Sequence, residues 1–217
     1  MEIVGNDEFE AAGLDDWRKL AQRLHARFWA SGSLAAADAV AAILAETGRY
    51  ADHLDLRLIG QMIDIAVCTR HDGRWVTEQD VDLAGKISVL TRELGLTPEP
   101  AAVTQLELAL DTARKEVIGP FWSTLLTGSP DNAIHGSVFD PTDRVPSLWF
   151  QATDDHEVPR QRWHFDLWLA PEAAAERIAA AIAAGGTLVD DSAAPLCTVL
   201  ADPDGNRVCV CTSAGRD

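Results

Sequence analysis

Two segments in the second half of the chain repeat one pattern. Residues 105–112 read QLELALDT and residues 164–171 read HFDLWLAP. Apolar and polar residues alternate in both, which is typical of half-buried strands. A helix-like stretch, an Asp-Pro turn and another strand-like run follow each segment. The second half is therefore expected to contain two copies of one unit, with a site between them and Gln105 and His164 in equivalent positions.

A proline-rich segment precedes this repeat. Residues 95–100 read GLTPEP, and two prolines after a helix-like run end the helix and indicate a linker. We therefore predict two domains, 1–97 and 98–217. The repeat covers about 101–213 as two strand–helix–strand–strand units.

Local patterns predict mixed helices and strands. Helices are expected over 15–24, from an N-cap at Ser33 to Glu46, and after Thr77, where Asp80 completes a capping box. The alternating run at 62–67 predicts a strand. The apolar residues expected to be buried in the two longer helices are Leu34, Val40, Ile43 and Leu44, then Val81, Ala84, Ile87, Val89 and Leu90. The predicted fold class is α+β, with largely antiparallel sheets.

The formal net charge of −16 argues against nucleic acid and anionic membrane as partners. No apolar run approaches the roughly 20 residues that span a bilayer, and the acidic N-terminus does not resemble a signal peptide. The four cysteines lack C-x-x-C spacing, which favours free thiols in a reducing compartment. We therefore expect a cytoplasmic protein.

The repeat resembles a glyoxalase-like domain of the vicinal oxygen chelate superfamily. The residues that carry this resemblance are the run 163–169, an Ala-rich helix ending at Gly185-Gly186, and the turn 202–206. The resemblance implies paired βαβββ modules, about 101–155 and 160–213, that form a curved sheet around a cavity.

Metal-dependent members of that superfamily take one ligand from the first strand and one from the last strand of each module. By this resemblance the candidate ligand positions are Gln105, Gln151, His164 and Cys209. The set contains no carboxylate, although hard divalent cations prefer anionic oxygen ligands. We therefore expect that no cofactor is required, and a metal-dependent enzyme stays an alternative. His164 could equally be an ordinary strand histidine held by a neighbour.

Aromatic residues on the predicted strands offer a second use for the cavity. Trp149, Trp163 and Trp168 could line an apolar pocket for a small ligand. The alternative is that these side chains belong to the core.

The first half resembles the pterin-4a-carbinolamine dehydratase family. The resemblance runs through residues 52–55, the strand 63–67, and residues 69–84. The family's hallmark is His-His-Pro before a strand, a Thr-His-Asp-like turn after it, and an aspartate that opens the last helix. Asp52 replaces the first histidine and His53 matches the second. His71 matches the third histidine if Arg70 is an insertion, and Asp80 matches the helix aspartate.

Loss of water from a 4a-hydroxytetrahydropterin requires one proton to reach the leaving hydroxyl and another to leave a ring nitrogen. Histidine suits both tasks because its pKa lies near neutrality. We predict His53 and His71 as catalytic residues, with Asp52 orienting an imidazole or accepting a proton. Asp80 is expected to bind substrate together with the three tryptophans. The alternative reading makes both histidines solvated loop residues.

The leading hypothesis is therefore a dehydratase-like lyase acting on a pterin-like small molecule, fused to a glyoxalase-like binding domain. A non-catalytic binding or interaction protein built on two degenerate scaffolds is the alternative from another class. The resemblance also implies possible self-association into a homo-oligomer.

Overall fold

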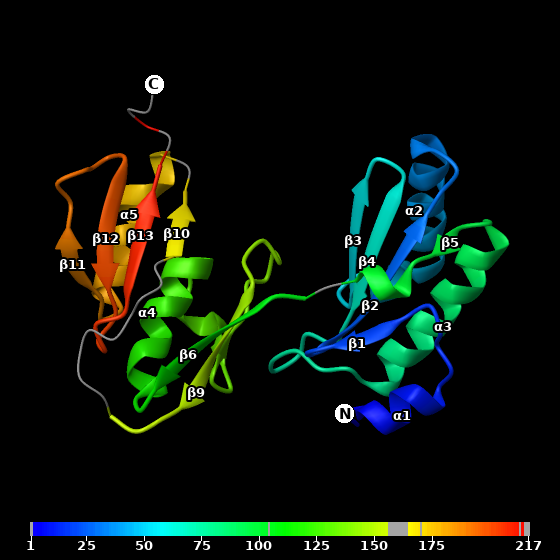
Figure 1. The fold of residues 1–217 in the computed structure, drawn as a ribbon, viewed down its shortest axis with the longest axis horizontal. Coiled ribbons are helices and arrows are strands. Elements are labelled where there is room, and N and C mark those ends of the chain that lie inside the picture. Colours follow the sequence, from blue (N-terminus) through cyan, green and yellow to red (C-terminus); the bar gives the residue numbers. More distant parts are fainter. Residues whose placement is uncertain (1, 104, 156–164, 170, 213, 215–217) are drawn as a thin grey trace. The chain divides into compact units, whose positions relative to one another are not determined.

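The computed structural model describes residues 2–103, 105–155, 165–169, 171–212 and 214. The described residues form an α+β fold, as predicted, in two compact units, Met1–Gln105 and Leu106–Asp217 (Figure 1). Among the helices of the described residues, none combines the length and apolar character that a membrane crossing needs.

The first unit contains one five-stranded antiparallel sheet with strand order β1-β2-β4-β3, and β5 pairs with β2. Its strands are β1 (Arg18–Leu20), β2 (Arg23–Trp29), β3 (Leu54–Ile59), β4 (Met62–Val67) and β5 (Thr97–Pro98). Its helices are α1 (Asn6–Ala11), α2 (Ser33–Thr47) and α3 (Glu78–Glu93), with 3₁₀ turns η1 (Gly48–Tyr50) and η2 (Pro100–Ala102).

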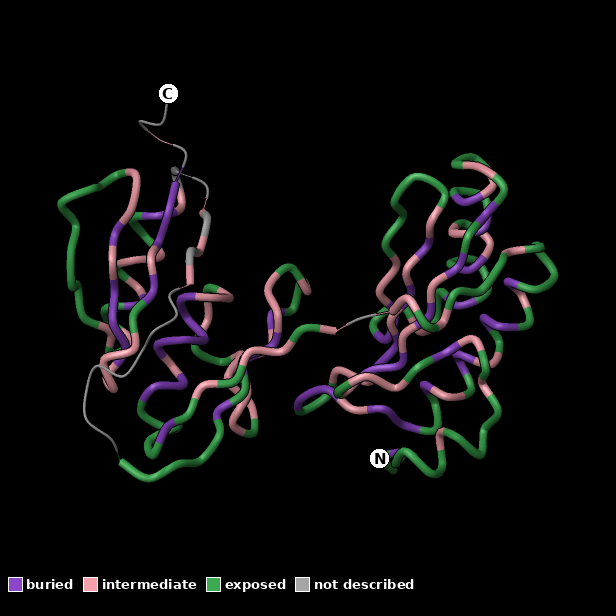
Figure 2. The backbone as a smooth tube through the Cα atoms, viewed as in Figure 1, coloured by how far each residue is buried: buried purple, intermediate pink, exposed green. Residues whose placement is uncertain are grey.

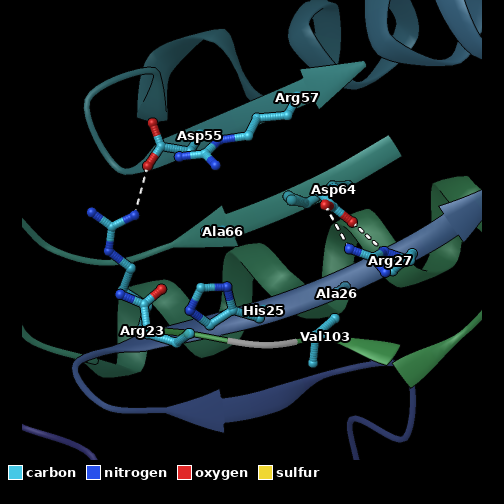
Figure 3. A pocket seen from close by; sticks show the side chains of 11 residues that line it. Arg23, His25, Ala26, Arg27, Asp55, Arg57, Asp64, Ala66 and Val103 are labelled. Carbon is cyan, nitrogen blue, oxygen red and sulfur yellow. Dashed lines mark hydrogen bonds and ion pairs between the residues drawn. The ribbon is translucent and has the colours of Figure 1, made fainter. Parts of the chain in front are cut away.

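The core of the first unit lies between the sheet and the helices α2 and α3. Alternate strand residues such as Ala26, Phe28, Ile63 and Ile65 share it with Ile87 of α3. Burial therefore alternates along β2 and β4, as Figure 2 shows, because successive side chains of a strand point to opposite faces. The opposite sheet face carries His25, Arg27, Asp55 and Asp64 together with the apolar Ala66 (Figure 3).

The helix predicted over 15–24 is wrong. This segment contains β1 and the first residues of β2, joined by a turn in which Ala21 has φ 49°. The indole of Trp17 is fully buried, and its Nε1 donates to Ser88 Oγ over 2.9 Å. Helix-forming residues such as Lys19 are therefore held in a strand by tertiary packing, which outweighs weak local propensity.

The α2 helix lies at its predicted position, but the set of residues that it buries against the sheet differs from the predicted set. Gly32 is its N-cap, so Ser33 is already helical. Its buried residues are Ala36, Ala39, Ile43 and Thr47, whereas Leu34 and Leu44 are exposed. Two small alanines, and not the two leucines, therefore face the core here. In α3, Ala84 and Ile87 are buried as predicted, but Val89 is 52% exposed.

The segment after α3 belongs to the first unit, which places the unit boundary after Gln105. Thr97 and Pro98 pair with Trp29 and Phe28 of β2. The carbonyl of Ala102 accepts a hydrogen bond from the Arg27 side chain over 3.1 Å. The prolines therefore end the helix as expected, but the chain then extends the sheet as an edge strand.

The second unit contains the predicted pair of βαβββ modules. The first module comprises β6 (Glu107–Thr112), α4 (Lys115–Thr127), η3 (Pro130–Asn132), β7 (Ala133–Ile134), β8 (Ser137–Val138) and β9 (Ser147–Ala152). The second comprises β10 (Phe165–Trp168), α5 (Pro171–Ala183), β11 (Thr187–Asp190), β12 (Cys197–Ala201) and β13 (Arg207–Cys211). Each module forms its own four-stranded sheet, and its first strand pairs in parallel with its last.

The two modules share one core rather than one continuous sheet. Phe121 and Trp122 of α4 pack with Phe150 of β9 and Val208 of β13. The indole Nε1 of Trp122 also donates to Asp202 of the second module over 2.8 Å. The single curved sheet implied by the resemblance is therefore replaced, in the described residues, by two sheets on a common helical core.

The two Asp-Pro turns are stabilised in the same way, by an aspartate carboxylate that accepts backbone hydrogen bonds. Asp140 accepts backbone hydrogen bonds from residues 142, 144 and 145. Asp202 accepts them from residues 204 and 206. A short carboxylate that accepts nearby backbone N–H groups fixes a turn locally. The repeat seen in the sequence therefore corresponds to two turns of the same construction at Asp140 and Asp202.

Candidate active site

A buried histidine–aspartate pair lies at one end of the first unit's sheet. His53 immediately precedes β3, and Asp80 lies in the first turn of α3. The distance from His53 Nδ1 to Asp80 Oδ1 is 2.8 Å. The Asp80 side chain is fully buried and the His53 side chain is 11% exposed. A buried charge needs a partner, so this contact satisfies the carboxylate as well as the ring.

The second carboxylate oxygen of Asp80 holds the adjacent loop. Asp80 Oδ2 accepts from the backbone N–H groups of Thr69 and Thr77 over 3.1 and 2.8 Å. The hydroxyls of both threonines lie 2.8 Å from the same oxygen. The contact with Thr77 N confirms the predicted capping box. Asp80 therefore ties the end of β4 and the start of α3 to His53.

This arrangement determines which ring nitrogen of His53 can act on a ligand. An ionised carboxylate oxygen can only accept, so Nδ1 carries the proton that it donates to Asp80. Nε2 has no hydrogen-bond partner among the described residues and is the atom left to exchange a proton with a ligand. A carboxylate that orients an imidazole in this way is the usual arrangement of a histidine acid–base group.

Tyr50 of η1 packs beside His53. Its ring meets the His53 ring edge-on, with centroids 6.2 Å apart. Arg49 and Lys86 lie over the Tyr50 ring, 4.7 and 5.4 Å from its centroid. Cationic side chains are attracted to an aromatic face, so these contacts restrain Tyr50.

Cys68, directly after β4, is buried. Burial raises the pKa of its thiol, which keeps the group protonated at neutral pH. Cys68 therefore does not provide a thiolate nucleophile beside His53.

The other predicted catalytic residues lie differently. Asp52 is exposed, and its backbone carbonyl accepts a hydrogen bond from Arg70 over 2.9 Å. His71 is exposed in the turn after β4. Among the described residues, no hydrogen bond joins His71 to the His53–Asp80 pair. The structure thus brings His53 and Asp80 together, and it leaves Asp52 and His71 on the surface nearby.

The structure places Asp80 away from the surface. Its carboxylate is fully buried and engaged on both oxygens, and its Oδ1 contacts His53. The sequence pattern predicted that Asp52 orients an imidazole or accepts a proton. The capping box at Thr77 and Asp80 was visible in the sequence, but the approach of α3 to His53 was not.

Three of the four candidate metal positions lie within the described residues. Gln105 precedes β6 and lines a cavity of the first unit instead. Gln151 is exposed on β9 beside Asp111, and Cys209 is half-buried on β13. His164 lies outside the described residues. Within the described residues, no group of three or more histidine, cysteine, aspartate or glutamate side chains could hold a metal ion.

Of the three tryptophans expected to line a pocket, Trp149 alone has a described side chain. Trp149 lies on β9 and is 38% exposed, on the face opposite to the buried Phe150. Trp163 and the side chain of Trp168 lie outside the described residues. Phe150 itself packs in the core, so the described aromatics do not form a common pocket.

Comparisons with known proteins found similarity to parts of both halves of the chain. Residues 107–211 match the family model of the glyoxalase-like domain. A transcriptional coactivator/pterin dehydratase from Brucella melitensis is 20% identical, with a TM-score of 0.37, and the match covers 41% of this chain and 98% of that chain. A glyoxalase/bleomycin resistance protein from Albidiferax ferrireducens is 25% identical, with a TM-score of 0.37, and covers 49% of this chain and 95% of its own. None of the curated proteins compared matches this chain.

Proposed function

We propose that this protein is a dehydratase-like lyase that removes water from a 4a-hydroxytetrahydropterin, with His53 as its principal acid–base group. The observation that carries the proposal is the 2.8 Å contact between His53 Nδ1 and the fully buried Asp80. Nothing in the local helix capping requires a histidine at this position. An imidazole with one nitrogen engaged and the other available fits proton transfer better than a purely structural role.

The reaction needs proton transfer alone. The bond from C4a to the hydroxyl oxygen breaks, the hydroxyl leaves with a proton as water, and a ring nitrogen loses a proton as its double bond to C4a forms. His53 Nε2 would serve one of these transfers, and Asp80 would stabilise the imidazolium form. His71, in the exposed turn after β4, is proposed for the other transfer. We propose that no cofactor is required.

The glyoxalase-like unit is proposed to bind a small molecule or to support assembly. Its two modules enclose a well-packed core that includes Phe121 and Trp122. Such a scaffold can hold loops in place without contributing to the proton transfers. We therefore assign the proposed chemistry to the first unit alone.

The test is the rate of dehydration of a 4a-hydroxytetrahydropterin, followed by absorbance against the spontaneous reaction. The intact protein is expected to exceed the background. His53→Asn is expected to lower the rate about 10²- to 10⁴-fold, the range for loss of an acid–base group. His135→Asn removes an imidazole from the second unit and serves as the matched control, with an unchanged rate.

The outcomes separate the alternatives. No rate above background with the intact protein would leave the non-catalytic binding role. A normal rate in His53→Asn would remove His53 from the chemistry. A loss in His53→Asn with a normal rate in His71→Asn would assign both transfers to the His53 region.

A further inference from the structure

Three cysteines of the second unit lie on one face of its β10-β13-β12-β11 sheet. Cys197 is in β12, and Cys209 and Cys211 are in β13, which pairs with β12 (Figure 1). Val208 and Val210 alternate with the two cysteines of β13 and belong to the core. Because successive side chains of a strand point to opposite faces, the cysteines share the sheet face opposite to that core. None of the three forms a disulfide in this structure.

The strand register brings two of these thiols into contact. Cys197 is paired directly with Cys211, and their Sγ atoms are 3.7 Å apart. The N–H of Thr212 donates to the carbonyl of Leu196 over 3.1 Å, and the carbonyl of Cys211 accepts from Leu169 N on its other side over 2.9 Å. This pattern identifies Cys197 and Cys211 as a non-hydrogen-bonded pair, in which paired side chains lie closest.

That geometry suits a disulfide. The Cα atoms of a non-hydrogen-bonded antiparallel pair are about 4.5 Å apart, within the range of about 4.4–6.8 Å that disulfides span. The sulfurs of Cys197 and Cys211 can therefore be joined by rotation of their side chains, while the two strands keep their positions.

The same geometry argues against the pairings that involve Cys209. This residue is paired with Val199, so it lies diagonally across from Cys197. The Cα atoms of diagonal neighbours are about 7–8 Å apart. Alternate residues of one strand, such as Cys209 and Cys211, are about 6.5–7 Å apart with their side chains parallel. Both separations lie at or beyond the upper end of the disulfide range, so Cys209 is expected to keep its thiol.

Exposure distinguishes the two paired thiols. Cys197 is half-buried, whereas Cys211 is buried. Oxidation of cysteine follows the exposure of its sulfur. A small oxidant therefore reaches Cys197 first, and Cys211 lies next to it, in position to react with the oxidised sulfur.

We propose that Cys197 and Cys211 form a redox-sensitive dithiol, which hydrogen peroxide oxidises to a cross-strand disulfide and a small thiol such as glutathione reduces again. Cys197 reacts as its thiolate with one peroxide oxygen. The O–O bond breaks, the other oxygen leaves as hydroxide, and the thiol proton converts that hydroxide to water. Cys197 is then a sulfenic acid.

The second step uses the neighbouring thiol. The Cys211 sulfur attacks the sulfenic sulfur, the S–O bond breaks, and the hydroxide leaves as water with the Cys211 proton. The two thiols thus lose two electrons and two protons, and the peroxide is reduced to two waters. Reduction by two molecules of glutathione reverses the change and yields glutathione disulfide. The site is independent of the proposed dehydratase chemistry.

The first experiment is peptide mapping by mass spectrometry of the intact protein after treatment with hydrogen peroxide, without reducing agent. The expected product is a single disulfide between Cys197 and Cys211, which disappears after incubation with reduced glutathione. A disulfide that contains Cys209, or oxidation of Cys197 to sulfinic or sulfonic acid without a disulfide, would overturn the proposal.

Two variants test the order of the steps. Cys211→Ser removes the second thiol, so the sulfenic acid at Cys197 should accumulate and be trapped as an adduct with dimedone. Cys209→Ser changes a thiol of the same strand and face and is the matched control, with a disulfide yield within about twofold of the unchanged protein. Absence of the adduct from Cys197 in a folded Cys211→Ser, or loss of the disulfide in Cys209→Ser, would contradict the assignment.

The disulfide also has an expected effect on stability. It closes a loop of about 15 residues through β12 and β13, which restricts the unfolded chain. Peroxide treatment should therefore raise the midpoint of thermal unfolding by about 5–10 °C in the unchanged protein and leave Cys211→Ser unchanged. An equal shift in both proteins would show that the disulfide is not its cause and would overturn this part of the proposal.

Discussion

Substitution of Asp80 by asparagine tests how the His53 ring is held. Asparagine keeps the shape of the side chain but has one acceptor oxygen in place of two. Oδ2 of Asp80 receives contacts from Thr69 and Thr77, including two backbone N–H groups, whereas Oδ1 serves His53 alone. The amide oxygen of Asp80→Asn should therefore take the threonine side, and its NH₂ group should face Nδ1 of His53.

The first expected result is a change of tautomer. Nδ1 must accept from the amide NH₂, so the ring proton moves to Nε2. Nitrogen-15 correlation spectra of the imidazole distinguish these two forms directly. The proposed dehydration should slow at the same time, because Nε2 can no longer accept a proton.

The second expected result is a loss of stability. A hydrogen bond between a ring N–H and a carboxylate contributes about 1.5–3 kcal/mol, and Asp80→Asn should lower the free energy of unfolding by about that amount. Asp80→Ala removes the acceptors of His53, of the buried Thr77 and of the half-buried Thr69, and should cost about 3–5 kcal/mol. Urea unfolding, with the midpoint and slope fitted separately, measures both values. Asp82→Asn, on the exposed side of the same helix, should change stability by less than about 0.5 kcal/mol.

The reasoning is refuted if Asp80→Asn leaves both the stability and the imidazole spectrum unchanged. A double-mutant cycle with His53→Ala separates the pair from the threonine contacts. A coupling energy of at least about 1 kcal/mol is expected for residues in direct contact. A coupling near zero would show that Asp80 serves only the capping box.

Three further outcomes follow from other parts of the structure. Asp140→Asn should lower the free energy of unfolding by about 1–3 kcal/mol at pH 7. Burial opposes ionisation of Asp140, but the hydrogen bonds of its own turn lower the pKa of its carboxyl group below 3.8. The ionised carboxylate therefore stabilises the folded protein above pH 3.8, and this stabilisation is lost as the pH falls through the lower pKa of the folded state. Urea unfolding at a series of pH values measures this dependence. Treatment with a mild disulfide oxidant should link Cys197 to Cys211, whose sulfurs lie 3.7 Å apart on directly paired residues, and peptide mapping that finds other pairings would contradict this. Gly186→Ala would place a Cβ in steric conflict with the fully buried Phe121 ring and should destabilise the protein by about 1–3 kcal/mol in thermal unfolding. An unchanged melting temperature would show that this contact relaxes without cost.

Local patterns predicted the elements whose stabilising contacts are close in sequence. The strand at 62–67 and the capping box at Thr77 and Asp80 agree with the structure. The order of strands and helices in the βαβββ modules agrees as well. Two-residue alternation and capping hydrogen bonds depend on a few neighbouring residues, so they can be recognised in a single sequence.

Local patterns were wrong where distant packing outweighed them. Trp17 and Leu24 are buried in the first unit's core, and this burial draws the helix-prone segment between them into a hairpin. The inward face of α2 consists of Ala36, Ala39, Ile43 and Thr47 and leaves Leu34 and Leu44 exposed, so side-chain hydrophobicity alone does not predict which face is buried. The boundary after Gln105 depends on an edge-strand pairing with β2 that no local signal announces.

The same division applies to the candidate site. The sequence alone was sufficient to single out His53 and to place Asp80 at a helix start, because a motif and a cap are local features. Only the tertiary structure decided that Asp80, and not Asp52, holds the imidazole, since this depends on α3 crossing the end of the sheet. It also decided that charged side chains from three strands line one cavity, because the lateral order of strands is set by pairing across the whole sheet.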